Sequence, residues 1–354
     1  MNEHTAAVDD RPLLLSEYDY ELPPELIAQT PADRRDGSRL MVVDRRDGTF
    51  EHHIFPDIVT FLRPGDLLVI NDTRVLPARF HGRKPTGGNV ELLLLRRLEA
   101  GVWEAMGKPG RHLRPGSMVH LLTREGDPRD VVVAIERRLD GGLFAVRLPA
   151  EVEERLDRFG EMPLPPYIHA RLEDPERYQT VYSEKPGSAA APTAGLHFTP
   201  KLLATLEKRG VRVARVTLHV GLGTFLPVKV DDMRRHEMHA EWFHVPTGTR
   251  AAIQETKARG GRVIAVGTTS CRTLESVAGC EDEGDLSGWT SLFITPGYRW
   301  KTVDALITNF HLPRSTLLLL VSAFAGRELM LNAYQEAIRQ GYRFYSFGDA
   351  MLIV

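Results

Sequence analysis

Residues 262–276 read RVIAVGTTSCRTLES, an apolar run of strand length followed by a Gly/Thr/Ser turn and a helical pattern. A buried strand that leads through a short turn into a helix is typical of α/β domains. The alternation continues outward on both sides and predicts a mixed or parallel sheet covered by helices. The other expected elements are helices at 24–30, 54–62, 200–209 and 250–259, strands at 40–44, 67–70, 211–218, 305–308 and 344–347, and a helix between the last two strands.

The pattern changes between Ala78 and Pro149. Short β-type runs, punctuated by Gly and Pro, follow one another there without helices, as in a small barrel or sandwich. We therefore predict an α/β fold with an inserted all-β, barrel-like domain. The predicted core domain consists of residues 1–77 and 150–354, and the insert of residues 78–149.

The composition is that of an ordinary soluble globular protein. The chain has 354 residues, of which 42% are hydrophobic and 26% charged. Its two cysteines are too few for a disulfide framework and favour a reducing compartment. The N-terminus lacks the basic and apolar segments of an export signal, and the apolar run at 316–325 is about half the ~20 residues of a membrane span. We expect a cytoplasmic protein without a membrane anchor.

The net charge of −2 does not indicate a nucleic-acid partner, but residues 71–120 form a basic region. This region contains nine Lys or Arg against four acids, so its net charge is +5. Such a region contacts phosphates in some proteins and is simply a solvated face in others.

The turn at 267–272 directs backbone N–H groups and hydroxyls towards one point, where a helix N-terminus would stabilise a carboxylate or phosphate. The alternative is that Thr269 or Ser270 only caps its helix. The sequence contains neither a phosphate-loop lysine motif nor a G-x-G-x-x-G fingerprint after this strand, so it does not support a nucleoside triphosphate or dinucleotide site.

Two histidines are candidates for proton transfer. His197 ends the small-residue run AAPTAGLH, and His219 ends a predicted strand before the glycines of GLGTF. Each is open to a structural interpretation, as a core histidine bonded to its surroundings.

Other polar turns also follow predicted strands. Asp72 follows the strand at 67–70, and residues 308–316 follow the strand at 305–308, so these turns are expected to converge at one edge of the sheet. The segment from His236 to His244 does not fit a zinc protease, because His239 comes three rather than four residues after His236.

The same turns are part of a wider resemblance. YDYELPPELIAQTP, DLLVINDTRVLPAR, PGSAAAPTAGLHFT, TLHVGLGTF, GTTSCRTLES, LITNFHLPRSTLLLLVSAFAG and YRFYSFGDAMLI occur in this order from Tyr18 to Ile353. The chain resembles the S-adenosylmethionine:tRNA ribosyltransferase-isomerases of queuosine synthesis along nearly its whole length.

The resemblance implies a cytoplasmic transferase and isomerase that needs no cofactor or metal. It would consume S-adenosylmethionine as a ribosyl donor and modify the 7-aminomethyl-7-deazaguanine (preQ1) wobble base of tRNA with a GUN anticodon. Epoxyqueuosine-tRNA, adenine and methionine would be the products. A monomer that does not bind membranes is expected.

Residue roles follow from the resemblance and the side-chain chemistry together. The expected catalytic residues are His197 and His219, with Asp72 or Glu241 as a supporting carboxylate. The expected S-adenosylmethionine contacts are Thr224, Thr268, Thr269, Ser270, Arg272, Asn309, His311 and Arg314. The expected tRNA contacts are Arg74, Arg79, Arg83, Lys84, Lys108 and Arg111.

Two alternatives remain open at the level of sequence. A small-molecule methyltransferase or hydrolase would use the same donor but never meet RNA. A noncatalytic RNA-binding module would use the β insert and leave the donor intact.

Overall fold

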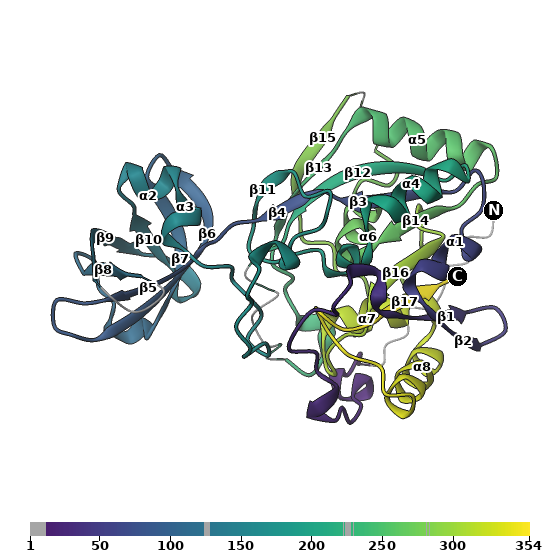
Figure 1. Cartoon of the computed structure of the whole chain (residues 1–354), viewed down its shortest axis with the longest axis horizontal. Coiled ribbons are helices and arrows are strands. Elements are labelled where there is room, and N and C mark those ends of the chain that lie inside the picture. Colours follow the sequence, from purple (N-terminus) through teal and green to yellow (C-terminus); the bar gives the residue numbers. More distant parts are fainter. Residues whose placement is uncertain are drawn as a thin grey trace, which may run out of the picture.

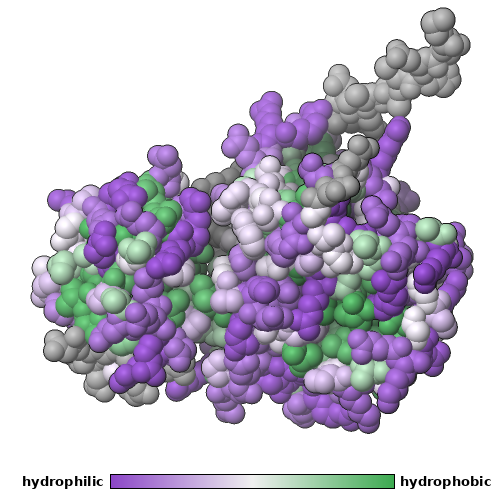
Figure 2. Space-filling view, turned by 90° about the horizontal axis from the view of Figure 1, so that it is seen from above, coloured by the Kyte–Doolittle hydropathy of each residue, from purple (hydrophilic) through white to green (hydrophobic). Residues whose placement is uncertain are grey.

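The computed structural model describes residues 12–123, 128–221, 223, 228, 230–280, 282 and 284–354. The chain forms a large α/β core and a smaller β-barrel, joined by two stretches of chain that run between them (Figure 1). Figure 2 shows the same two bodies with mostly hydrophilic surfaces and scattered hydrophobic patches. The predicted fold class, a mixed-sheet α/β core with an inserted all-β barrel, is confirmed.

A nine-stranded sheet forms the centre of the core within the described residues. Its strands, in the order in which they lie side by side, are β15 (Leu286–Thr290), β13 (Glu241–Val245), β12 (Arg212–His219), β3 (Leu67–Asn71), β14 (Val263–Val266), β16 (Ala305–Asn309), β17 (Ala350–Ile353), β1 (Arg39–Asp44) and β2 (Thr49–Ile54). The block β12, β3, β14 and β16 is parallel, and β13 and β17 run antiparallel to its two outer members. The carboxyl ends of the parallel strands therefore meet at one edge, together with the start of β13.

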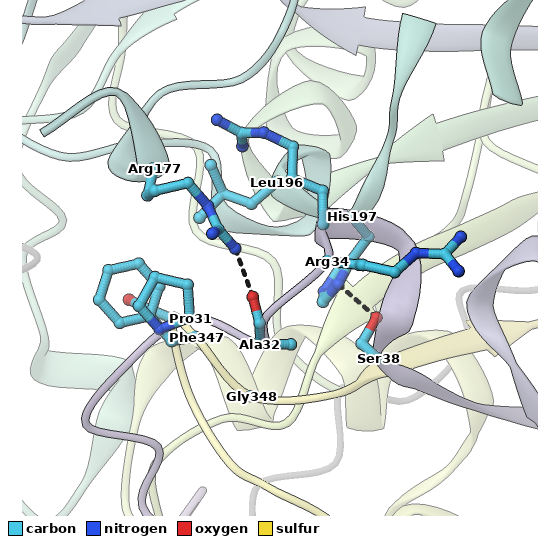
Figure 3. A pocket seen from close by; sticks show the side chains of 11 residues that line it. Pro31, Ala32, Arg34, Ser38, Arg177, Leu196, His197, Phe347 and Gly348 are labelled. Atoms are coloured by element: carbon cyan, nitrogen blue, oxygen red, sulfur yellow. Dashed lines mark hydrogen bonds between the residues drawn. The ribbon is translucent and has the colours of Figure 1, made fainter. Parts of the chain in front are cut away.

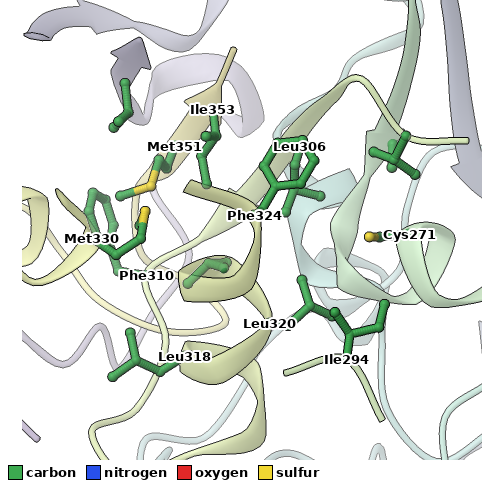
Figure 4. Close-up of a cluster of buried hydrophobic side chains, with 14 of the residues drawn as sticks. Cys271, Ile294, Leu306, Phe310, Leu318, Leu320, Phe324, Met330, Met351 and Ile353 are labelled. Carbon is green, nitrogen blue, oxygen red and sulfur yellow. The ribbon is translucent and has the colours of Figure 1, made fainter. Parts of the chain in front are cut away.

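Helices cover both faces of this sheet, so its central strands are apolar on both sides. In β16, Leu306 packs into one hydrophobic cluster while Ala305 and Ile307 pack into the other, as the two-residue period of a strand requires. Figure 4 shows side chains of the first cluster, among them Leu306, Phe310 and Phe324. The first cluster includes residues of α5 (Thr247–Ala258), α6 (Gly267–Ser276), α7 (Thr316–Ala325) and α8 (Arg327–Arg339), and the second includes residues of α1 (Ile58–Phe61) and α4 (Pro200–Lys208).

The apolar helix α7 is a core element. No single helix in the described part of the chain is long and apolar enough to cross a membrane. α7 and α8 meet the length and composition criteria only as a pair, and that pair is bent by 113°.

The barrel is closed and antiparallel, which leaves no free strand edge. Its strands, in order around the barrel, are β10 (Phe144–Arg147), β7 (Val102–Lys108), β6 (Asn89–Glu99), β5 (Arg79–Arg83), β8 (Met118–Leu122) and β9 (Pro128–Arg138). Phe80, Leu92 and Phe144 fill its interior. The short helices α2 (Ala150–Glu154) and α3 (Leu156–Phe159) follow the last strand and pack against the same cluster through Val152 and Leu156. The domain boundaries at 77/78 and 149/150 stay a prediction.

Two local predictions are wrong, those at 344–347 and 24–30, and the helix expected at 54–62 is confirmed with different bounds. The strand expected at 344–347 is a turn, and the strand β17 begins only at Ala350, because Tyr345 has a φ of 71° and the Asp349 carboxylate accepts the backbone N–H groups of Arg39 and Arg343. The helix expected at 54–62 starts with a 3₁₀ turn at Phe55–Asp57 and is α-helical only from Ile58. The helix expected at 24–30 is reduced to a 3₁₀ turn at Pro24–Leu26.

The connection between barrel and core is tightly packed. A short parallel pair, β4 (Thr73–Val75) and β11 (Lys185–Ser188), extends from the core, and the backbones of Arg79 and Glu161 exchange two hydrogen bonds beyond it. A Cβ atom added at Gly160 would lie 1.9 Å from the carbonyl oxygen of Pro77. The two connecting segments therefore pass each other where only glycine fits.

We expect Gly160→Ala to lower the free energy of unfolding by about 1–3 kcal/mol, because the added methyl group forces these segments apart. Urea denaturation measures the effect. Gly248→Ala in α5 is the matched control, since nothing lies within 4 Å of its Cβ position. If the urea midpoint of Gly160→Ala equals that of the wild type, the two segments accommodate the added methyl group without loss of stability.

Candidate active site

A cavity of about 520 Å³ lies at the carboxyl edge of the parallel strands. Its polar lining includes Glu241 at the start of β13, the first turn of α6 after β14, and Asn309 at the end of β16. Small side chains from residues 190–194 form another part of its wall. This volume is within the range of roughly 300–1,000 Å³ that small-molecule sites occupy. The predicted convergence of polar turns at one sheet edge is thus observed for the turns after β14 and β16.

The first turn of α6 forms an anion-binding arrangement in this cavity. Gly267 has a φ of 86°, which lets the chain turn sharply from β14 into the helix. Among the described residues no side chain caps the helix, so its first N–H groups can bind an anion. Thr268, Thr269 and Arg272 line the cavity here, and the Thr269 hydroxyl and Arg272 Nη2 are buried without a hydrogen-bond partner among the described residues.

Arg272 is fixed by a buried ion pair. Its Nη1 donates to Glu241, its Nε donates to the Leu292 carbonyl over 3.1 Å, and both side chains of the pair are less than a tenth exposed. Glu241 also accepts the backbone N–H of Gly221 over 3.0 Å. The protein therefore binds Nε and Nη1 of the guanidinium, while Nη2 remains available to a ligand.

His197 lies behind the wall of this cavity. Its Nδ1 is 2.7 Å from the Ser38 hydroxyl (Figure 3), and its Nε2 is 3.1 Å from the Asn309 amide nitrogen. Because the amide donates to Nε2, the ring proton is on Nδ1 and the imidazole is neutral. Burial, and then the charge of Arg343, lower the pKa of His197 from 6.5 to about 3. Thr193 donates to the Asn309 oxygen over 2.8 Å, so the amide that lines the cavity is bound on both sides.

His219 and Asp72 lie outside the cavity. The His219 ring stacks on Trp242 with a centroid distance of 5.1 Å, bonds the Thr73 hydroxyl over 2.8 Å, and has a pKa lowered to about 4 by burial. Asp72 is buried and accepts the Thr217 hydroxyl over 2.6 Å; burial is the main reason its pKa is raised. The structure therefore does not bring His219 and Asp72 together with His197 or with the Arg272 turn.

His311 and Arg314 do line the cavity. Nε2 of His311 is 2.9 Å from the Thr308 hydroxyl, and burial lowers its pKa to about 3, so this ring is neutral. Arg314 is half exposed, with its guanidinium 3.8 Å from both Asp19 and Asp231. His236 and His239 also face the cavity; burial, then the charge of His239, lower the pKa of His236.

The remaining predicted site residues lie in α6, outside the described residues, or in and beside the barrel. Ser270 is fully buried beneath the first turn of α6, and Thr224 lies outside the described residues. Arg83, Lys84, Lys108 and Arg111 gather at one end of the barrel, where β5 and β6 are joined and Lys84 contacts the His112 carbonyl. Arg74 and Arg79 lie instead at the connection between the barrel and the core. Arg74 donates to the Ser183 hydroxyl, and Arg79 donates to the Leu164 carbonyl.

Aromatic residues of the cavity wall were missed in the sequence. Tyr167 and Tyr345 lie with their ring centroids 4.8 Å apart, and Tyr167 bonds the Ser346 hydroxyl over 2.7 Å. Phe293 lies elsewhere in the same wall. The only signal was the aromatic content of PLPPY and YRFYSFG, which does not by itself separate a ligand wall from a core. Within the described residues, no group of three His, Cys, Asp or Glu side chains is placed to bind a metal ion.

The chain is similar to known proteins over almost its full length. A family model described as queuosine biosynthesis protein matches residues 15–353. The S-adenosylmethionine:tRNA ribosyltransferase-isomerase of Symbiobacterium thermophilum is 55% identical over 345 residues, which cover 96% of this chain and 99% of the relative. The crystal structure of the S-adenosylmethionine tRNA ribosyltransferase from Thermotoga maritima is 41% identical, with a TM-score of 0.56 and coverage of 96% of this chain and 100% of that one.

Proposed function

Because this chain belongs to the family of queuosine biosynthesis proteins, we propose that it catalyses the reaction for which its 55% identical relative is named. It is an enzyme of this family, an S-adenosylmethionine:tRNA ribosyltransferase-isomerase in queuosine synthesis. The ribosyl part of S-adenosylmethionine is transferred to the preQ1 base at the wobble position of tRNA with a GUN anticodon and isomerised. Epoxyqueuosine-tRNA forms, and adenine and methionine leave.

The observation that carries this proposal is the anion-binding turn of α6. The donor has a methionine carboxylate, and the turn offers free N–H groups, the Thr269 hydroxyl and Arg272 Nη2 within one cavity. A carboxylate bound by a guanidinium at a helix N-terminus gains charge-assisted hydrogen bonds and a favourable helix dipole. The sulfonium and ribose would then extend across the cavity towards Asn309 and His311.

The aromatic wall suits the other substrate. A wobble base must leave the stack of the anticodon loop before it can react, and unstacked bases bind aromatic side chains. Tyr167, Tyr345 and Phe293 supply such surfaces beside the donor position. The exposed basic end of the barrel, with Arg83, Lys84, Lys108 and Arg111, would contact phosphates of the same tRNA.

Proton transfer has several candidate imidazoles. The assignment of acid and base to His197 and His219 stays a prediction from the sequence. Two other imidazoles, those of His236 and His239, face the cavity directly, as does the Glu241 carboxylate. We propose that the proton from the ribose carbon bonded to sulfur passes to one of these cavity-facing groups, while His197 positions Asn309.

Further properties follow from the proposed chemistry. S-adenosylmethionine is consumed as a substrate, so we propose that no cofactor or metal is needed. We also propose that the enzyme acts as a monomer in the cytoplasm, where its two substrates are present, and does not bind membranes.

Adenine release from S-adenosylmethionine tests this function directly. We expect release only when tRNA carrying preQ1 is present, together with a matching mass gain on the RNA. S-adenosylhomocysteine as the product would show a methyltransferase instead. RNA binding without consumption of the donor would show a noncatalytic binding module.

A further inference from the structure

A second, much smaller pocket lies on the other side of His197. It has a volume of about 20 Å³ and is lined by three arginines, Arg34, Arg35 and Arg177, together with Ser38 and His197 (Figure 3). The first two arginines belong to the charged turn that precedes β1, and Arg177 belongs to the 3₁₀ helix Pro175–Tyr178. None of these arginines has a part in the site described above.

Arg35 and Arg177 are placed as an open anion-binding pair. Within the described ranges neither guanidinium forms an ion pair with a carboxylate, whereas Arg34 pairs with Asp36. Arg35 donates to the Glu176 carbonyl over 2.6 Å, and Arg177 donates to the carbonyls of residues 32 and 33. Backbone carbonyls thus fix both side chains without neutralising them.

Each of the two guanidiniums also has a buried N–H group without an acceptor. Arg35 Nη1 and Arg177 Nε have no hydrogen-bond partner in the described part of the chain. Burial, and then the charge of Arg177, lower the pKa of Arg35, although Asp174 and Glu176 act in the opposite direction. Two like charges in one pocket, each with an unpaired buried donor, are unfavourable unless an anion neutralises them.

The size of the pocket limits what this anion is. About 20 Å³ accommodates oxygen-sized groups and excludes a nucleobase or a ribose. A phosphate can place its oxygens there while the rest of a larger molecule stays outside. Guanidinium groups bind phosphate through paired N–H donors, which makes arginine the usual residue at such sites.

The pocket is separated from the large cavity by little more than one side chain. Ser346 lines both spaces, and His197 lines the small pocket while it bonds Asn309 of the large cavity. We propose that the pocket between Arg35 and Arg177 binds a backbone phosphodiester of the RNA, next to the nucleotide whose base enters the large cavity. This inference rests on the proposed function, which supplies the RNA substrate.

Binding of preQ1-containing tRNA to the full-length enzyme, measured by fluorescence anisotropy at several salt concentrations, tests the proposal. We expect Arg35→Gln and Arg177→Gln each to raise Kd by about tenfold, since each removes a charge-assisted hydrogen bond. The slope of log Kd against log salt concentration should fall by about 0.7 when the phosphate contact is lost. Arg46→Gln is the matched control, because Arg46 is an exposed arginine paired with Asp44 in the turn after β1.

The outcomes separate this proposal from the proposed function. Absence of adenine release by the wild type would refute the function itself. Adenine release by the wild type, with Kd and salt slope in both glutamine variants equal to those of Arg46→Gln, would overturn the phosphate site alone. If inorganic phosphate raises the Tm of the wild type but not of the variants while RNA binding is unchanged, the pocket binds a free anion and the proposal is also overturned.

Circular dichroism shows whether the glutamine variants are folded. If either is not, Arg35→Lys and Arg177→Lys replace them, because they keep the charge and remove only the paired donors. These variants are expected to retain the salt slope and to weaken RNA binding. Wild-type affinity in both would overturn the proposal.

Discussion

Arg272→Met is expected to lower the free energy of unfolding by about 3–5 kcal/mol, because it leaves the Glu241 carboxylate buried without its partner. The same change removes the Nη2 donor that faces the cavity. Loss of a charge-assisted hydrogen bond should weaken S-adenosylmethionine binding by roughly 10- to 100-fold. Urea denaturation measures the first effect, and isothermal calorimetry with the donor measures the second.

A second variant separates the two effects of this change. Arg272→Met combined with Glu241→Leu replaces the buried ion pair by apolar groups, which is often neutral for stability. We expect the double variant to recover much of the lost stability but none of the lost affinity for the donor. A double variant that binds S-adenosylmethionine as tightly as the wild type would show that Arg272 does not contact the carboxylate.

The fold was predictable because its patterns are local. The strand and turn at 262–270 and the helix-free stretch from 78 to 149 each show their periodicity within a few residues, so the α/β class and the inserted barrel followed from the sequence. The strand expected at 344–347 had the right composition, but its backbone bends at Tyr345. That residue has a positive φ, and in the same turn the Asp349 carboxylate accepts the backbone N–H groups of Arg343 and of Arg39, which lies far away in the sequence.

The site was predictable only where topology determines it. Arg272, Asn309 and Glu241 face one cavity because β13, β14 and β16 present their ends at one edge of the sheet. The directions of His219 and His197 depend on packing that no spacing reveals. His219 belongs to a strand in which successive side chains alternate, and it stacks on Trp242 while the next residue, Val220, lines the cavity.

The buried imidazoles show why the presence of a histidine in the sequence is not enough to identify a residue that transfers protons. Histidine attracts a catalytic assignment because its ordinary pKa is near neutral, but burial lowers the pKa of His197 and His311 to about 3 and that of His219 to about 4. These rings remain neutral at pH 7. The neutral ring of His197 has hydrogen bonds at both nitrogens and is therefore suited to hold Asn309 in position.

His197→Leu is expected to lower the free energy of unfolding by about 2–5 kcal/mol at neutral pH, because the Ser38 hydroxyl and the Asn309 amide each lose a buried partner. Turnover should fall by roughly tenfold or more as Asn309 loses its position, while the shape of the pH–rate profile stays that of the wild type. A profile that loses a limb would instead show that His197 carries a proton. His219→Leu is the matched control: it removes a buried imidazole that bonds one hydroxyl outside the cavity and should change turnover much less.

The pH dependence of stability gives an independent test of the same residue. The folded protein keeps His197 neutral down to a pKa of about 3, whereas the unfolded chain takes up a proton near 6.5. The unfolded state therefore binds more protons between these values, and the stability that His197 contributes above pH 6.5 is lost as the pH falls towards 3. Urea denaturation at about pH 7.5 and about pH 5 should show a smaller acid-induced loss for His197→Leu than for the wild type. Equal losses in the two proteins would mean that His197 is protonated in the folded state, and the neutral ring that positions Asn309 would have to be abandoned.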